Sequence, residues 1–177
     1  NGFIFAVKAS RYITHMKKLK DPTESVANFM RAVAGLGDKL GPILFQLPPR
    51  WRSNPDRLEA FLACLPADHT YAFEFRDESW FEDEVFDILR RHNAAFCVYE
   101  LAGRRSPREV TGETVYIRLH GPEDAYEGSY STQALAGWAG AISAWAGQGK
   151  TVHCYFDNDQ NGYAARNAVE LASMLTE

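Results

Sequence analysis

The stretch TVYIRLHGP, residues 114–122, decides the fold class of this chain. Apolar residues at positions 115, 117 and 119 alternate with a tyrosine, an arginine and a histidine, which is the period-two pattern of a β-strand. The strand ends at Gly121-Pro122, so Arg118 and His120 lie near its C-terminal end and on one face. A strand with one apolar face and one face of chemically active groups indicates helices on one side and a functional site on the other.

Strand patterns and helix patterns alternate along the rest of the chain. We expect strands at residues 3–9, 42–48, 71–76, 95–100, 115–120 and 151–157. We expect helices at residues 24–36, 55–65, 80–92, 131–147 and 162–175, with N-caps at Asn54, Ser79 and Ser131. The polar segment 101–113 contains Gly and Pro and joins two strands without a helix.

Repeated βα units predict a parallel sheet with helices outside it, either doubly wound or closed into a barrel. Central strands of a doubly wound sheet are apolar on both faces, whereas most of these strands have one mixed or polar face. This favours an α/β fold of the TIM-barrel-like (β/α) parallel class, incomplete here with about six strands of the usual eight. We expect residues 1–177 to be a single domain, the C-terminal part of such a barrel. The start at Asn1-Gly2 without an initiator Met indicates a fragment.

Composition limits the classes of function. The chain is 46% apolar with a net charge of −4, which is typical of a folded domain and disfavours broad electrostatic binding to nucleic acid. No apolar run reaches the ~18 residues that span a bilayer, and no signal peptide is present, so we expect a cytoplasmic protein with no membrane contact. The three cysteines, Cys64, Cys97 and Cys154, are expected to be buried thiols in a reducing compartment.

Polar side chains follow the strands at the ends where barrel enzymes hold their catalytic groups. We expect them to converge over a plug of apolar residues on the same face, namely Ala6, Leu44, Ala72, Phe96 and Val98. The catalytic candidates are Lys8, Glu74, Arg76, Arg118 and His120. The ligand-binding candidates are Arg11, His15, Gln46, Trp80, Glu100, Tyr126, Tyr130, Tyr155, Asp157, Asn158 and Asp159.

The charges at this predicted site indicate a polar or anionic small molecule. Lys8, Arg76 and Arg118 are suited to a carboxylate, a phosphate or a developing oxyanion. Glu74 would act as a base or orient one, and His120 would act as an acid or base. The residues Gln46 and Asn158 would fix the orientation of the ligand.

Two other chemistries fit parts of the pattern less well. Glu74 and Glu100 follow successive strands, as in a glycosidase with Trp80 or Tyr126 against a sugar, but Arg76 beside Glu74 would keep that carboxylate ionised. Glu74, His120 and Asp157 could hold a divalent metal, but no H-x-H or H-E-x-x-H spacing supports this. The sequence therefore predicts no metal site and identifies no cofactor.

The most basic segment is KASRYITHMKKLKDP, residues 8–22. Its lysines at 17, 18 and 20 fit either a solvated loop or an anion-steering rim that touches phosphates. The second reading keeps open a nucleic-acid-binding or nuclease-like barrel protein, with aromatic side chains stacking on a base.

Several motifs together resemble the YecE-like family, also called domain-of-unknown-function family 72. The motifs are FAVKASRYITHMKKLKDP, GPILFQLPPRW, YAFEFRDESWF, YIRLHGP, YEGSYS and YFDND followed by GYAARNA, in this order over nearly the whole chain. The resemblance implies a TIM-barrel-like fold, no settled activity and an absent N-terminal portion that supplies the first two strands. The family pattern falls on Lys8, Arg11, His15, Gln46, Pro48, Glu74, Arg76, Trp80, Arg118, His120, Gly121, Tyr130, Asn158 and Asp159.

Three positions depart from the family pattern. Asp157 stands where family members often have an amide, Asp77 where they often have His, and Glu100 where an Asp is frequent. The catalytic assignment of Asp157 is therefore weaker than that of Glu74 or His120.

The sequence favours an enzyme that binds an anionic or polar small molecule at the C-terminal ends of the strands, with proton-transfer or hydrolytic chemistry of a hydrolase, lyase or isomerase type. Two alternatives stay open. One is the nucleic-acid-binding protein, and the other is a non-catalytic ligand-binding module.

Overall fold

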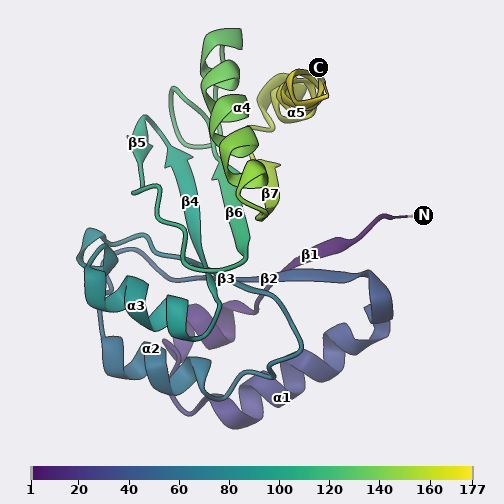
Figure 1. The fold of residues 1–177 in the computed structure, drawn as a ribbon. Helices are drawn as coiled ribbons and strands as arrows, with labels where there is room; N and C mark the ends of the chain where they lie inside the picture. Colours follow the sequence, from purple (N-terminus) through teal and green to yellow (C-terminus); the bar gives the residue numbers. More distant parts are fainter. Residues whose placement is uncertain (1, 177) are drawn as a thin grey trace. The chain divides into compact units, whose positions relative to one another are not determined.

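The structure is a computed structural model that describes residues 2–176. Two compact units divide these residues, the first ending at Phe96 and the second beginning at Cys97 (Figure 1). The boundary falls inside one strand. The prediction that the whole chain is a single domain stays a prediction.

The first unit alternates strands with helices. Its strands are β1 (Phe5–Lys8), β2 (Leu40–Gln46), β3 (Tyr71–Glu74) and the start of β4 (Ala95–Leu101). They pair in parallel in the order of the chain. The helices are α1 (Pro22–Val33), α2 (Pro55–Leu62) and α3 (Asp83–Arg91). Three short turns accompany them, a π-helical η1 (Tyr12–Met16) and the 3-10 helices η2 (Ala34–Lys39) and η3 (Glu78–Trp80).

Aromatic side chains fill the core between the helices and one face of these strands. Phe45 of β2 lies 5.0 Å from Phe61 of α2 and 6.4 Å from Phe29 of α1, measured between ring centroids. Phe96 of β4 meets Phe86 of α3 edge to face at 5.2 Å. Apolar burial of this kind is the main stabilising contribution to a βα layer. The helices therefore cover one face of the strands and leave the other face for polar groups.

The second unit continues the same plan. The rest of β4 pairs in parallel with β6 (Thr114–Leu119), which pairs in parallel with β7 (Thr151–Phe156). A two-residue strand, β5 (Arg104–Arg105), returns antiparallel along β4. The helix α4 (Thr132–Gly147) packs on β7 and on α5 (Tyr163–Leu175), which follows the short turn η4 (Gln160–Gly162).

The predicted fold class is confirmed. Within residues 2–176 the chain is an α/β protein whose six main strands are parallel, a TIM-barrel-like arrangement with fewer strands than a complete barrel. All six expected strands are present, and the segment 101–113 carries no helix. The side chains of Asn54 and Ser131 cap α2 and α4 by accepting bonds from the amides of Arg57 and Ala134, as expected.

The predicted cap at Ser79 is wrong. The expected helix over 80–92 is divided into η3 and the shorter α3, and the side chain of Asp77 accepts the amide of Ser79. The Ser79 hydroxyl donates to Asp77 and accepts the amide of Ser53, so it ties two loops together. An Asx-type turn has displaced the first turn of the helix.

The predicted facing of β4 is also wrong. The packing of Phe96 on α3 places it on the helix side of the strand, not in the polar plug. In the second unit the register pairs Val98 with Ile117, Tyr99 with Arg118 and Glu100 with Leu119. Because directly paired residues of parallel strands share a face, Tyr99 shares the face of Arg118, whereas Glu100 shares the face of Leu119. β4 is buried on both faces, so its sequence does not show which face is which.

Two predictions from the composition concern membrane-spanning segments and the burial of the cysteines. Within residues 2–176, no helix combines the length and the hydropathy that a bilayer span requires. The three thiols are unbridged, but only Cys97 is fully buried, whereas Cys64 is exposed.

Candidate functional site

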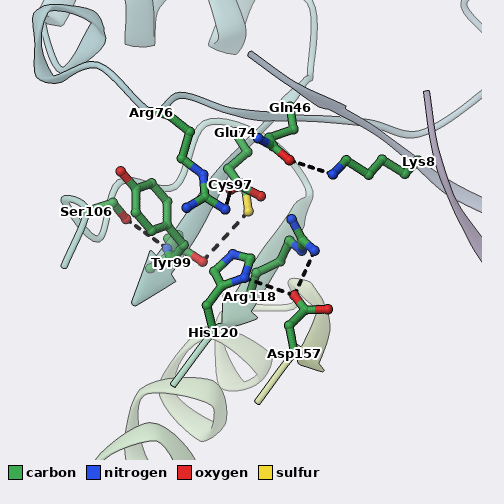
Figure 2. A network of polar contacts seen from close by, with 11 residues as sticks. Lys8, Gln46, Glu74, Arg76, Cys97, Tyr99, Ser106, Arg118, His120 and Asp157 are labelled. Carbon is green, nitrogen blue, oxygen red and sulfur yellow. Dashed lines mark hydrogen bonds and ion pairs between the residues drawn. The ribbon is translucent and has the colours of Figure 1, made fainter. Parts of the chain in front are cut away.

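In the first unit, polar residues share one face at the C-terminal ends of the strands. Lys8 pairs with Leu44, and Gln46 lies two residues further along β2 on the same face. Gln46 in turn pairs with Glu74 of β3, so Lys8, Gln46 and Glu74 share one face. The Lys8 ammonium donates to the Gln46 amide oxygen at 2.5 Å, as Figure 2 shows. Arg76 forms an ion pair with the buried Glu74 carboxylate. The predicted grouping of these four residues is thus present within this unit.

The chain after β1 turns back through the π-helical segment η1, which carries His15. The Nδ1 atom of His15 lies 2.8 Å from the Thr14 hydroxyl. Partial burial, followed by the positive charges of Arg11 and Lys8, lowers the pKa of His15 below its usual value. Short π-helical segments are frequent at functional sites. The assignment of Arg11 and His15 as ligand-binding residues stays a prediction.

In the second unit, β6 and β7 bring together a guanidinium, an imidazole and a carboxylate. The register pairs Arg118 with Tyr155, so the next same-face positions, His120 and Asp157, lie side by side beyond the strand ends. Arg118 Nη2 is 2.7 Å from Asp157 Oδ2, and His120 Nδ1 is 3.2 Å from the same oxygen (Figure 2). Asp157 therefore holds both a permanent cation and a titratable ring.

The contact between His120 and Asp157 is close but is not aligned as a hydrogen bond. Catalytic hydrogen bonds are often long or poorly aligned before a ligand binds. The same Asp157 oxygen approaches Arg118, which makes this carboxylate the common anchor of the group. An ionised carboxylate accepts hydrogen bonds only, so its position favours a proton on His120 Nδ1.

Aromatic rings surround the polar group on the same face. The rings of Tyr99 and His120 lie 6.3 Å apart, and Tyr116 lies 5.0 Å from Tyr155. Burial, with a smaller contribution from Cys154, raises the pKa of Tyr155 above its usual value. Tyr155 therefore contributes a neutral phenol at neutral pH. Tyr99 was not predicted, because the alternation in β4 was assigned to the wrong face.

The loop after β6 folds back over His120. The Tyr126 amide donates to the His120 carbonyl at 2.6 Å, and the two rings meet edge to face at 5.5 Å. Gly121 has a φ of +117°, and a Cβ atom there would lie 2.3 Å from the carbonyl oxygen of Glu127. Glycine is required at this turn because any side chain would meet backbone atoms. Tyr126 is half exposed, and its assignment as a ligand-binding residue stays a prediction.

The comparisons with known proteins give the family of this chain. The profile of the family described as "Protein of unknown function DUF72" matches residues 1–177. The chain belongs to the DUF72 family. No curated protein matches it.

Solved structures of other DUF72 proteins have the same fold. A DUF72 family protein from Thermotoga maritima MSB8 is 28% identical, with a TM-score of 0.90 over 99% of this chain and 74% of that one. Two structures of a DUF72 family protein from Enterococcus faecalis V583 have TM-scores of 0.83 and 0.82 at 21% and 19% identity. They cover 99% of this chain and 79% and 75% of theirs. The last two comparisons show the fold alone.

In this DUF72 chain two predicted ligand-binding residues make contacts within the protein. The Tyr130 hydroxyl accepts the Gly121 amide at 3.1 Å, and its ring is buried against Phe156. The Asn158 amide group donates to the Gly128 carbonyl and to the side chain of Asn167. Both residues therefore hold the 121–130 loop, and their assignment as ligand-binding groups stays a prediction.

Asn167 of α5 is the positioning residue that the sequence reasoning missed. It is buried, its oxygen accepts the Tyr130 amide at 3.1 Å, and its nitrogen donates to the Tyr130 carbonyl at 3.2 Å. Asn167 thereby gives the Tyr130 backbone the two hydrogen bonds that a neighbouring strand would otherwise supply. A polar residue among alanines in GYAARNA is the signal that could have found it.

Trp80, Glu100 and Asp159 also differ from expectation. Trp80 is fully buried, is stacked on Phe75 at 4.8 Å and donates to the Trp51 carbonyl. Glu100 is buried on the far face of β4 and pairs with Arg105 at 3.1 Å. Asp159 is exposed and begins η4.

The two clusters have different chemical capacities. Arg118 and His120, anchored by Asp157, can bind an anion and exchange a proton. Lys8, Gln46 and the Glu74–Arg76 pair can bind polar groups. Within residues 2–176, no three His, Cys, Asp or Glu side chains are gathered so that they could hold a metal ion.

Proposed function

We propose that this DUF72 protein is an enzyme that binds a polar, anionic small molecule at the C-terminal ends of its strands and acts by proton transfer or hydrolysis. The observation that carries the proposal is the shared anchoring of Arg118 and His120 by Asp157 in the second unit. A barrel strand whose last inward residues are a guanidinium and an imidazole has the composition of an active site rather than of a packed core.

Arg118 is the anion-binding group of this proposal. Its side chain is only 12% exposed, so its charge is weakly screened by solvent. Asp157 fixes the guanidinium from one side, and the planar fork of N–H donors in a guanidinium matches the geometry of a carboxylate or phosphate. Because Asp157 is shared with His120, an incoming anion that binds Arg118 also changes the electrostatic field at the imidazole.

His120 is the proton-transfer group. Asp157 lies on the Nδ1 side of the ring, so Nε2 is the nitrogen that exchanges a proton with the ligand. The His120 carbonyl is fixed by the Tyr126 amide, and the following residue is held by the Tyr130 hydroxyl. The backbone that carries the ring is thus held at two successive positions.

Arg118→Met is expected to abolish stabilisation by anionic ligands. A bound ligand at about 100 times its Kd stabilises a protein by about 2.7 kcal/mol, which raises the Tm of a chain of this size by roughly 5–10 °C. A thermal-shift screen of anionic metabolites measures this for the wild type and for Arg118→Met. Arg166→Met, an exposed change on α5, is the matched control and should keep the wild-type shifts.

The same screen separates the alternatives. Equal shifts for the wild type and Arg118→Met would place the ligand elsewhere and reject the proposed site. Salt-dependent binding of DNA or RNA that is lost on changing Lys17, Lys18 and Lys20 would favour the nucleic-acid-binding protein instead. Binding at Arg118 without turnover would indicate a non-catalytic module.

A further inference from the structure

We propose that the anion bound at Arg118 carries a planar aromatic ring, which lies against the Tyr155 side chain in the second unit. This inference rests on the proposed function and deepens it, because it names the class of ligand. Its basis is a set of aromatic side chains that shares one face of the strands with Arg118.

The two faces of β4, β6 and β7 differ in composition. The register pairs Arg118 with Tyr99 of β4 and with Tyr155 of β7, and it pairs Tyr116 with His153. All three tyrosines of these strands therefore lie on the side of Arg118. The pairs on the opposite face include Val98 with Ile117 and Val115 with Val152.

Tyr155 contacts two of these rings and keeps part of its own surface open. Its ring centroid is 5.0 Å from that of Tyr116 and 6.4 Å from that of His153, and the planes of the His153 and Tyr155 rings differ by only 6°. Tyr155 and His153 are partly exposed, whereas Tyr116 is buried. Tyr116 thus supports the Tyr155 ring from within the protein, and the exposed part of Tyr155 is available to a ligand.

The position of Tyr155 beside Arg118 fits a ring that bears its charge directly. Neighbouring strands are about 4.8 Å apart, and Asp157 holds the Arg118 guanidinium at 2.7 Å. A carboxylate or phosphate attached to a ring that packs on Tyr155 therefore reaches Arg118 without a long linker. Burial raises the pKa of Tyr155, so its phenol is neutral at neutral pH and does not repel the anion.

Two further rings flank His120, the proton-transfer group. The Tyr99 ring lies 6.3 Å from the imidazole at an interplanar angle of 75°, and the Tyr126 ring lies 5.5 Å from it at 88°. Tyr126 is half exposed, and its amide bonds to the His120 carbonyl at 2.6 Å. Because His120 and Arg118 approach the same Asp157 oxygen (Figure 2), a ligand between them meets aromatic surface near both.

An aromatic carboxylate or an aryl phosphate is the class of ligand that fits this face. Tyrosine offers a large, rigid apolar surface with a polar hydroxyl at its tip. Ring-to-ring packing adds to simple burial, and its contribution corresponds to an affinity gain of about 2–10-fold. A saturated chain would be buried equally well by aliphatic residues like those of the opposite face.

The test is an NMR titration with two matched pairs of ligands, benzoate with cyclohexanecarboxylate and phenyl phosphate with cyclohexyl phosphate. The members of a pair carry the same anionic group, and the saturated ring has at least as much apolar surface. A preference for the aromatic member therefore measures ring-to-ring packing. In at least one pair we expect saturable binding, with the aromatic member about 2–10-fold tighter.

Tyr155→Leu is expected to bring the ratio of the two Kd values to about one, mainly by weakening the aromatic member. Trp145→Leu is the matched control and should keep the wild-type ratio. Trp145 lies in the last turn of α4, where its carbonyl accepts the Lys150 amide just before β7 begins, so it is at the other end of the strand from Asp157. Circular dichroism of each variant shows whether the fold is kept.

The outcomes distinguish this inference from the proposed function. Arg118→Met should weaken both members of the binding pair roughly tenfold or more, since it removes a charge-assisted contact. Binding that requires Arg118 but shows no aromatic preference, or a preference that Tyr155→Leu retains, would overturn this inference and leave the proposed function standing. Aromatic ligands that bind Arg118→Met as well as the wild type would reject the proposed site and this inference with it. The absence of saturable binding by all four ligands would also overturn the inference.

Discussion

Gly121→Ala is expected to lower the free energy of unfolding by roughly 3 kcal/mol or more, through backbone strain and overpacking together. Gly121 has a φ of +117°, which L residues rarely adopt. The added methyl would lie 2.3 Å from the Glu127 carbonyl oxygen and 2.8 Å from that of Asp124. These are backbone atoms, so no side-chain rotation relieves the clash. The loop that carries Tyr126 over His120 must move.

Chemical denaturation measures this effect, and α4 provides a matched control. Gly137 is exposed in the middle of that helix, and an added Cβ would meet nothing within 4 Å. Gly137→Ala should therefore raise the free energy of unfolding by about 0.5–1 kcal/mol. If the two variants changed stability equally and in the same direction, the described turn at Gly121 would be wrong.

His120→Asn is expected to lower turnover of an anionic substrate by about 10²–10⁴-fold, the usual contribution of a positioned acid or base. Asparagine keeps a polar side chain of similar size but cannot exchange a proton near neutral pH. Since Arg118 is retained, binding should change much less than turnover. The measurement is kcat and KM for a compound identified by thermal shift, with the far-UV spectrum as the control for folding.

His69→Asn is the histidine control, because His69 lies at the N-terminal side of β3 and pairs with Asp68 at 3.6 Å. It should leave kcat unchanged. Turnover that disappears in both His120→Asn and Glu74→Gln, with the fold intact, would exclude a non-catalytic binding module. Full turnover in His120→Asn would remove this residue from the mechanism.

Much of the fold follows from the sequence because local signals and the global arrangement agree. The 114–122 stretch alternates cleanly, since β6 has one polar and one apolar face, and its register with β7 is the expected one. Asn54 and Ser131 cap helices because their side chains meet free amides at fixed spacing. Ser79 had the same signal, but Asp77 two residues earlier competed for its amide.

The site was less predictable than the fold, because its details depend on tertiary contacts. β4 is buried on both faces, so the alternation of its residues does not show which of them face the site. The sequence therefore predicts Glu100 on the site face, whereas the register places Tyr99 there. Trp80, Tyr130 and Asn158 carry polar atoms that suit a ligand equally well. Their partners, the Trp51 carbonyl, the Gly121 amide and the Gly128 carbonyl, belong to loops whose positions no periodicity encodes.

The central claim is that Asp157 orients His120 for proton transfer beside Arg118. The most direct test is the nitrogen NMR spectrum of the His120 ring near neutral pH, in the wild type and in Asp157→Asn. We predict a protonated Nδ1 in the wild type and loss of that tautomeric preference in Asp157→Asn. A wild-type ring protonated on Nε2 alone, or a spectrum that Asp157→Asn leaves unchanged, would contradict it.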